Sequence, residues 1–469
     1  MKKLYILLFA GTVMAGCNKF KDDINTNPNA PSQASGTQLI ANAVLSLGTL
    51  QESPQGEFHA QYLSETQYPG SSLYPDGGTN FYPLYQGPLM NLQTVLNAAG
   101  TLSGSEGPVP NQIAIAKILK AYYFWHITDR WGDVPYTEAL KGQNNFTPKY
   151  DKQEVIYDSL FKELDEASAM IVGGTVLNDI IYNGDGTKWK KLANSIHLLM
   201  ALRLSEINPT KGTTEFNKAL TAGVMTANAD NFVFKHLSDA ANQSYWYGQV
   251  VTQNREWWAL SETLVNYMNP AGDPRLAVYG KKTTGSPSIY KGLAFGTTVG
   301  VPFNSSAVSL MGPAIYAQNC PIYLVTYAQV LFAKAEAAKK GWITGGDAEA
   351  KTNYDLAIQR SVEQWTGGTS GLAAFMTAPG IPYDPSTGLE QIGMQRYVHL
   401  FMHGYEAWAE WRRTGYPANL VTPGGRAIPL RHSYPANEVF NNAANYNDAV
   451  QRQFSGNDGL YGKVWWDKN

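Results

Sequence analysis

The feature of this sequence that most constrains its fold is the repeated spacing of apolar residues by three and four positions. Between residues 154 and 171 these residues are Ile156, Leu160, Leu164, Ala167 and Ile171, all on one face of a helix. Residues 189–203, 324–338 and 354–362 repeat the pattern, and a glycine-containing turn joins the last two. The chain has no sustained strand-like alternation. We therefore expect a mainly α-helical fold with helix pairs similar to tetratricopeptide repeats.

Long irregular segments separate these helices. Residues 66–88 and 268–313 are rich in Gly, Pro, Tyr and Asn, and segments of this length in a compact domain tend to be functional. Short strands are possible at 231–235 or 292–303. No second linker follows Thr37, so we expect one domain over residues 37–469.

The N-terminal residues predict export and lipid anchoring. A basic start and an apolar run ending in small residues indicate a signal peptide over residues 1–16. The run is shorter than the roughly 20 apolar residues of a membrane-spanning helix. The string Met-Ala-Gly directly before Cys17 resembles a bacterial lipobox, and this resemblance implies that Cys17 is acylated. The alternative is an ordinary secreted protein in which this cysteine has no special role. Residues 17–36 read as a tether, in which Asp22 and Asp23 are either a surface-export signal or part of a solvated linker.

The composition excludes one class of ligand and favours two others. A net charge of −2 and a pI near 6.4 argue against nucleic acid, which requires a basic surface. Charged residues make up only 16% of the chain, which also contains 28 Tyr and 12 Trp. Such a surface suits uncharged ligands or a large protein contact. The second cysteine, Cys320, has no surrounding signature, and we expect it to be inert packing.

Four strings occur in order along the chain. They are Asp129-Arg-Trp-Gly-Asp-Val-Pro-Tyr-Thr-Glu-Ala139, Tyr157-Asp-Ser-Leu-Phe-Lys-Glu-Leu-Asp-Glu-Ala167, Trp189-Lys-Lys-Leu-Ala-Asn-Ser-Ile-His197 with Met200-Ala-Leu-Arg-Leu204, and Gly404-Tyr-Glu-Ala-Trp-Ala-Glu-Trp-Arg-Arg-Thr-Gly-Tyr-Pro417. Together with the lipobox, this set resembles the SusD/RagB family of outer-membrane lipoproteins over essentially the whole chain.

The resemblance implies a fold, a location and a partner. It implies tetratricopeptide-like helix pairs with ligand loops on one face, and a lipid-anchored protein on the outer membrane, facing the cell exterior. It also implies a SusC-like TonB-dependent barrel, over which the protein lies as a lid that captures substrate. The starch-binding branch often has Glu-Gly-x-Arg where this chain has His403-Gly-Tyr-Glu406. This chain therefore resembles a separate branch, and the sugar contacts of the starch-binding branch cannot be carried over.

No catalytic signature is present, and we expect neither an enzyme nor a cofactor. The sequence lacks Gly-x-Ser-x-Gly, His-Glu-x-x-His, Walker and Gly-x-Gly-x-x-Gly strings. The spacing of His399, His403, Glu406 and Glu410 places them on one helical face, either as metal ligands or, as we favour, as a polar face packed against other helices. Asn183-Gly-Asp185 suggests a calcium loop, but a turn before a helix near Lys188 is the better interpretation. We predict no bound metal.

Aromatic residues on the long loops are the best candidates for ligand contacts. Flat rings stack on the apolar faces of sugars, while neighbouring amides and carboxylates bind the hydroxyls, but the same residues also suit protein interfaces and loop cores. Tyr74, Tyr82 and Trp246 are the predicted ligand residues. The function that we predict is capture of a glycan, or of a peptide, for delivery to the transporter. An adhesion or scaffold module is the alternative, and a surface glycan hydrolase is less favoured.

Overall fold

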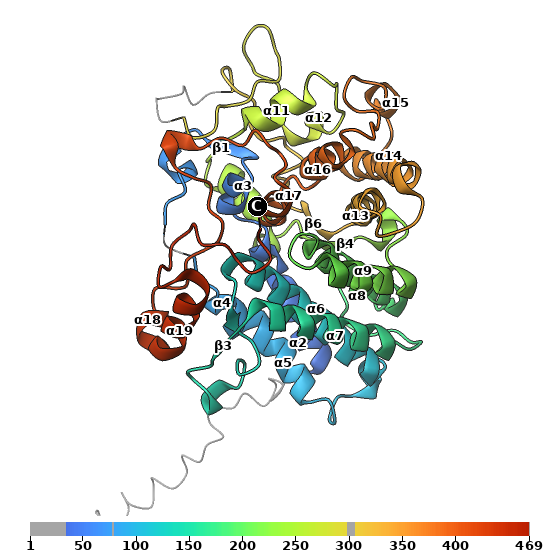
Figure 1. The fold of residues 1–469 in the computed structure, drawn as a ribbon, viewed down its shortest axis with the longest axis vertical. Helices are drawn as coiled ribbons and strands as arrows, with labels where there is room; N and C mark the ends of the chain where they lie inside the picture. The colour runs from blue at the N-terminus through green and yellow to red at the C-terminus, as the bar shows by residue number, and fades with distance from the viewer. Residues whose placement is uncertain (1–33, 77–78, 298–304, 469) are drawn as a thin grey trace, which may run out of the picture.

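The computed structural model describes residues 34–76, 79–297 and 305–468 (Figure 1). The predicted signal peptide, Cys17 and the tether up to residue 33 lie outside the described residues. Helices dominate the fold, as the apolar spacing predicts. The longer ones are α2 (Gly36–Leu45), α5 (Met90–Asn97), α6 (Val109–Trp131), α7 (Gln153–Met170), α8 (Gly186–Arg203), α9 (Pro209–Ala222), α13 (Tyr327–Lys339), α14 (Gly346–Thr366), α16 (Gly388–His399), α17 (Gly404–Thr414) and α19 (Ala443–Phe454).

Short helical turns occupy the irregular segments. They are α3 (Pro54–His59), α4 (Tyr82–Leu84), α10 (Tyr245–Tyr247), α11 (Glu262–Met268), α12 (Leu276–Tyr279), α15 (Leu372–Phe375) and α18 (Glu438–Asn441). The strands are β1 (Leu63–Glu65), β2 (Val134–Pro135), β3 (Tyr150–Asp151), β4 (Phe232–Lys235), β5 (Trp258–Leu260) and β6 (Pro321–Val325). They form three separate antiparallel pairs, β1–β5, β2–β3 and β4–β6. Strand β4 confirms the short strand predicted at 231–235. In the second predicted segment, Leu293 makes an isolated bridge to Ser261, while 298–303 lie outside the described residues.

The helix pair predicted from residues 324–338 and 354–362 is confirmed, because α13 packs against α14. Two further pairs, α6 with α7 and α8 with α9, pack in the same manner. In Figure 1, α8, α9, α13 and α14 lie along one side of the molecule, and α18 and α19 stand out on the other. Local sequence fixes where these helices begin. The Asp185 carboxylate accepts the backbone N–H groups of Thr187 and Lys188 at 2.9 and 3.3 Å, which caps α8. The turn predicted at 183–185 is therefore confirmed.

The apolar core has one large part under the helix pairs and another under the loops. The first contains the inward faces of α2, α5 to α9 and the strand pair β4–β6. The second gathers residues of α3, β5, α11, α17 and the 66–88 and 268–313 segments, among them Phe58, Tyr74 and Trp258. The described parts of the long loops thus contribute to a core of their own. Within the described residues, no helix has both the length and the apolarity that a membrane crossing requires.

The prediction of one continuous helix through residues 399–410 is wrong. α16 ends at His399, α17 begins at Gly404, and Met402 between them has φ of 63°. The reason is a close approach of two backbones: a Cβ on Gly404 would lie 2.2 Å from the carbonyl carbon of Gly56 in α3. Glycine at both positions lets α17 start directly against α3, and the chain breaks to reach that contact.

Candidate functional site

A groove of about 660 Å³ lies between α4 and its continuation η4 (Tyr85–Leu89), the 135–148 segment and α18. This volume is within the range of small-molecule binding sites, roughly 300–1,000 Å³. Its apolar wall contains Met90, Ala139, Leu140, Phe146 and Pro148, and its amide side chains are Gln86, Asn145, Asn437, Asn441 and Asn442. In Figure 1 the labels α4, β3 and α18 mark the surrounding elements at the lower left.

A single buried carboxylate organises one wall of this groove. Glu438 is 4% exposed, and its two oxygens accept the hydroxyl groups of Tyr82 and Tyr150. Burial, followed by the hydrogen bond to Glu438, raises the pKa of Tyr82 to about 12. Both phenols therefore stay neutral donors at physiological pH. The ring of Tyr82 is held at the groove before any ligand arrives.

The C-terminal helices hold the opposite rim. Asn442 Nδ2 donates to the Pro148 carbonyl at 2.8 Å, and Asn445 Nδ2 donates to the Thr147 carbonyl at 2.9 Å. These bonds fix the backbone beside Phe146, whose side chain remains 76% exposed. Because the backbone is already fixed, a ligand that covers Phe146 would have to order only its side-chain torsions.

The arrangement suits a neutral ligand that has both apolar faces and many hydroxyl groups. Rings and aliphatic side chains offer stacking surface, while the asparagine and glutamine amides offer donors and acceptors. Lys141 is the only cationic side chain on the groove's lining and Glu438 the only anionic one, as far as the described residues show. The groove therefore offers few charged side chains that could balance the charge of a phosphorylated or strongly charged ligand.

The three predicted ligand residues lie in different environments. Tyr82 lines the groove. Tyr74 is 4% exposed, has φ of 53°, and its hydroxyl accepts the Gln61 side-chain amide at 2.7 Å. The structure therefore brings only Tyr82 to the groove, and packs Tyr74 in the core beneath the loops.

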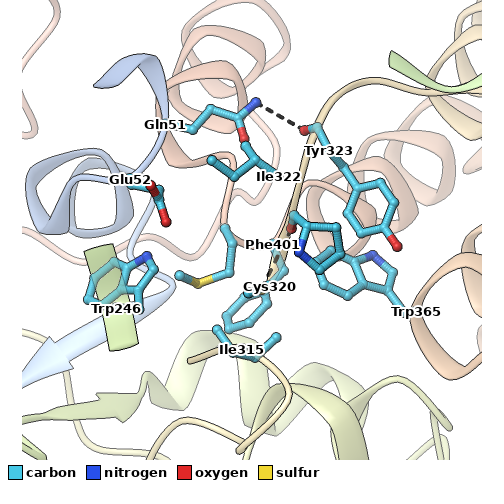
Figure 2. Close-up of a pocket in the computed structure, with 11 residues that line it drawn as sticks. Gln51, Glu52, Trp246, Ile315, Cys320, Ile322, Tyr323, Trp365 and Phe401 are labelled. Carbon is cyan, nitrogen blue, oxygen red and sulfur yellow. Dashed lines mark hydrogen bonds between the residues drawn. The ribbon is translucent and has the colours of Figure 1, made fainter. Parts of the chain in front are cut away.

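Trp246 is 3% exposed and lies beside a small, partly open cavity (Figure 2). Figure 2 shows Trp246 and Glu52 on one side of this cavity and Tyr323 and Trp365 on the other. Its volume is about 30 Å³, enough for one or two water molecules but too small for a sugar ring. Cys320 also lines the cavity, and burial raises the pKa of its thiol to about 12, which suppresses its nucleophilic form.

Sequence reasoning missed Phe146, Asn437 and Asn441. Phe146 belongs to no periodic segment, and its neighbours Asn144 and Asn145 resemble an ordinary loop. The stretch 437–447 does carry a signal, because it contains five asparagines within eleven residues. A run of amides next to an isolated aromatic residue could have pointed to this rim.

The residues weighed as a metal set are engaged elsewhere. The ring nitrogens of His399 lie 2.7 Å from Thr326 Oγ1 and 2.9 Å from Ser361 Oγ, and burial lowers its pKa to about 3. His403 faces the Leu324 carbonyl at 3.2 Å. Both glutamates of the set bond to arginines. These four side chains do not converge on a common point for an ion.

Those glutamates belong to a buried network of charges that joins five helices, α6, α8, α13, α16 and α17. Arg203 of α8 is fully buried and contacts Asp129 at 3.2 Å, Glu406 at 2.7 Å and Glu410 at 2.5 Å. Arg413 of α17 contacts Glu410 and, on α13, Glu336, each at 2.6 Å. Most of the charged residues in the family-like strings thus connect helices to one another and do not face the groove.

One other cluster has the composition of a metal site. Asp165, His197 and Glu215 can place one ligand atom each within 4.8 Å of one another, the one such group among the described residues. Lys218 pairs with both carboxylates, at 3.7 Å from Glu215. Its ammonium group already supplies the positive charge that an ion would bring. The two carboxylates outweigh burial and raise the pKa of His197.

Comparison with known proteins identifies the class to which this fold belongs. Residues 28–435 match the SusD-like family described as starch-binding and associating with the outer membrane. The chain belongs to this SusD-like family. No curated protein is similar enough in sequence to count as a match.

Solved structures agree with this assignment. A chitin-binding protein is 30% identical, with a TM-score of 0.82 over 93% of this chain and 100% of its own. An outer-membrane protein of Bacteroides vulgatus described as involved in nutrient binding is 25% identical, with a TM-score of 0.80 over 93% and 100% of the two chains. A SusD homologue from Bacteroides fragilis is 26% identical, with a TM-score of 0.78 over the same shares. The predicted family and the mainly helical fold are confirmed.

Proposed function

We propose that this protein is a lipid-anchored outer-membrane protein that binds an oligosaccharide in the groove and delivers it to a SusC-like TonB-dependent transporter. The observation that carries the proposal is the groove itself, which combines a fixed aromatic wall with a rim of amides and almost no charge. The 30% identity to a chitin-binding protein makes β-linked N-acetylglucosamine oligosaccharides the first ligand class to test.

The proposed activity is binding without cleavage. Most glycosidases use two carboxyl groups, separated by roughly 5–10 Å across the scissile bond. Glu438 is the only carboxylate among the described residues that line the groove, and two tyrosine hydroxyls already occupy its oxygens. Incubation with chitohexaose and maltohexaose, followed by mass spectrometry, is expected to return both sugars intact.

Calorimetric titration of these two sugars tests the groove. Phe146→Ala is expected to weaken binding about 5- to 150-fold, the equivalent of about 1–3 kcal/mol for a stacking aromatic residue. Asn441→Ala is expected to weaken it less. Phe440→Ala is the matched control. Phe440 is 83% exposed and lies on α18 next to Asn441, but it does not line the groove. Equal affinities of the Phe146 and Phe440 variants would contradict the groove assignment.

The three predicted residues can be separated by the same titration combined with thermal melts. Tyr82→Ala is expected to weaken binding. Tyr74→Ala and Trp246→Ala remove buried rings, so we expect them to lower the melting temperature in any case. If the fraction of either variant that remains folded binds the sugar more weakly than wild type, that residue belongs to the ligand site.

Because the groove holds so little charge, the affinity for the sugar is expected to change little between 50 and 500 mM salt. A strong salt dependence, or binding of peptides in place of both sugars, would refute the glycan proposal.

Delivery to the transporter needs a separate experiment. Detergent extraction of the native outer membrane, followed by affinity purification of this protein, should recover a TonB-dependent barrel. Recovery of the protein without a barrel, together with intact sugar binding, would favour the adhesion or scaffold alternative.

A further inference from the structure

A second hollow borders the groove along residues 139–142. This side pocket has a volume of about 660 Å³ and lies between α5, the 136–144 segment, α6 and α7. Met90 and residues 139–142 line both the groove and the side pocket, whereas all other residues of the two linings differ. Figure 1 shows α5, α6 and α7 together in the lower part of the molecule, beside β3 and α4. The two hollows are therefore neighbours that share one ridge of chain.

Hydrogen bonds hold this ridge in place on both sides of Leu140. The backbone N–H of Thr137 donates to Asp151 Oδ2 at 2.7 Å, and its hydroxyl group donates to Oδ1 at 2.9 Å. Asn145 Nδ2 donates to the Glu138 carbonyl at 3.3 Å. A ligand that crosses the ridge would meet backbone that is already ordered, so that little conformational entropy of the protein is lost on binding.

One wall of the side pocket is a face of α5. Met90, Gln93 and Asn97 follow one another at spacings of three and four residues, which places them on the same side of the helix. Gln93 Nε2 donates to Asn97 Oδ1 at 2.8 Å. Each side-chain amide has two N–H donors and an acceptor oxygen, so this pair keeps donors and an acceptor for a ligand.

The opposite wall carries an ordered pair of opposite charges. Lys120 of α6 lies 3.2 Å from Oε1 of Glu163 of α7, and the Tyr136 hydroxyl donates to the same oxygen at 2.9 Å. The side chains of Lys120 and Glu163 are 13% and 20% exposed, so the pair can be reached from the pocket but is held in place. An ammonium group has three N–H donors, and in the part of the chain that the structure describes Lys120 uses one of them, on Glu163. The others can donate to a hydroxyl group of a ligand.

The charge balance of the side pocket favours the same kind of ligand as the groove. Glu163 neutralises Lys120, and Lys141 is the one other charged side chain that lines the pocket within the described ranges. A neutral molecule with many hydroxyl groups suits both hollows. A small molecule would occupy one of them, whereas a chain of repeating sugar units that leaves the groove across Leu140 would enter the other.

We propose that the side pocket continues the binding site of the groove and binds the further sugar units of a long oligosaccharide. Lys120 donates to a sugar hydroxyl group there, and the amides of Gln93 and Asn97 bind neighbouring hydroxyl groups. The proposal rests on the proposed function for the class of ligand. It adds that this protein selects glycans by length, because contacts in two linked sites give a long chain a greater overall affinity than one site gives a short chain.

Calorimetric titration of the full-length protein with chitotriose and chitohexaose, and with maltotriose and maltohexaose, tests the side pocket. Wild type should bind the hexasaccharide of one series at least about tenfold more tightly than the trisaccharide. Lys120→Met should weaken hexasaccharide binding by about tenfold or more, as expected for the loss of a hydrogen bond to a charged group. It should leave the trisaccharide affinity unchanged, whereas Phe146→Ala should weaken the binding of both sugars.

The same helices offer a matched control. Lys117 of α6 pairs with Glu166 of α7 at 2.5 Å, one turn before Lys120, but neither residue lines the side pocket. Lys117→Met should therefore keep the wild-type affinity for both sugars while it loses a similar pair between α6 and α7. If Lys120→Met does not fold, Gln93→Ala makes the same comparison, with a smaller expected loss of hexasaccharide affinity.

The outcomes separate the side pocket from the groove. If wild type binds the two lengths equally, or if Lys120→Met and Gln93→Ala both keep the wild-type affinity for the hexasaccharide, the side pocket binds no sugar and the groove proposal stands on Phe146→Ala. If Lys120→Met weakens both lengths equally, the side pocket does not bind the further units of a longer chain. If Lys120→Met weakens only the hexasaccharide and Phe146→Ala weakens neither, the side pocket stands and the groove assignment fails. If wild type binds no sugar of either series, both proposals are refuted.

Discussion

Replacement of Glu57 by glutamine should make the protein less sensitive to pH. Glu57 lies on α3 and is fully buried, and its Oε1 accepts the backbone N–H of Gly404 at 3.0 Å. Burial raises the pKa of this carboxyl to about 8. A raised folded-state pKa means that the group stabilises the folded state fully below its unfolded value, near 4.5, and that this stability is lost as the pH rises through about 8.

The size of the effect follows from the two pKa values. Each pH unit between them removes about 1.4 kcal/mol, so the step from pH 5 to pH 7 removes about 3 kcal/mol. Glutamine can accept the same N–H and has no proton to lose. With an unfolding entropy of about 2.1 cal/mol/K per residue over roughly 430 residues, about 3 kcal/mol corresponds to about 3 °C in melting temperature.

Thermal melts of wild type and Glu57→Gln at pH 5, 6 and 7 measure this directly. The melting temperature of the variant should rise relative to wild type by about 3 °C between pH 5 and pH 7. Glu154→Gln is the matched control, because Glu154 is an exposed glutamate on α7, and its difference from wild type should stay constant. If the difference in melting temperature between wild type and Glu57→Gln does not change with pH, the Glu57 carboxyl is ionised in the folded protein over this range. The argument that burial keeps it protonated would then fail.

Three further outcomes are expected. Gly404→Ala would drive a Cβ to 2.2 Å from the Gly56 backbone, so its melting temperature should fall by at least about 3 °C, whereas Gly70→Ala, with no atom within 4 Å, should change it little. His197 has a raised pKa, so it stabilises the fold below pH 6.5 and loses this effect as the pH rises through the raised value; the melting-temperature gap to His197→Gln should shrink from pH 6 to pH 9. Cys17→Ala should release the protein from membranes and abolish labelling by a clickable fatty acid; a labelled or membrane-bound variant would exclude acylation at Cys17.

The helices could be predicted from the sequence because their signals are local. Spacing by three and four positions located α7, α8, α13 and α14, and Asp185 marked the start of α8 through its own capping bonds. The break between α16 and α17 could not be predicted in this way. It depends on the approach of Gly56, which is nearly 350 residues away in sequence.

The groove is harder to predict for the same physical reason. Glu438 binds Tyr82 and Tyr150 across separations of 356 and 288 residues, so no local pattern brings these three together. Burial also determines which aromatic side chains can contact a ligand. Tyr74 and Trp246 belong to aromatic-rich loops as Tyr82 does, yet those loops enclose a core of their own and bury both rings.

The residues that identify the family and the residues that would choose the ligand are largely separate. The strings at 189–204 and 404–417 supply Arg203, Glu406 and Arg413 to the buried charge network, and Gly404 to the contact with α3. Phe146 and the 437–442 rim lie outside all four strings. A change in the network should therefore damage the fold whatever the ligand is, because it leaves a buried charge without its partner. A change on the rim should alter which sugar binds while the helix pairs stay intact. If the groove binds the ligand as we propose, the same scaffold can in this way serve different glycans, and the rim determines which one binds.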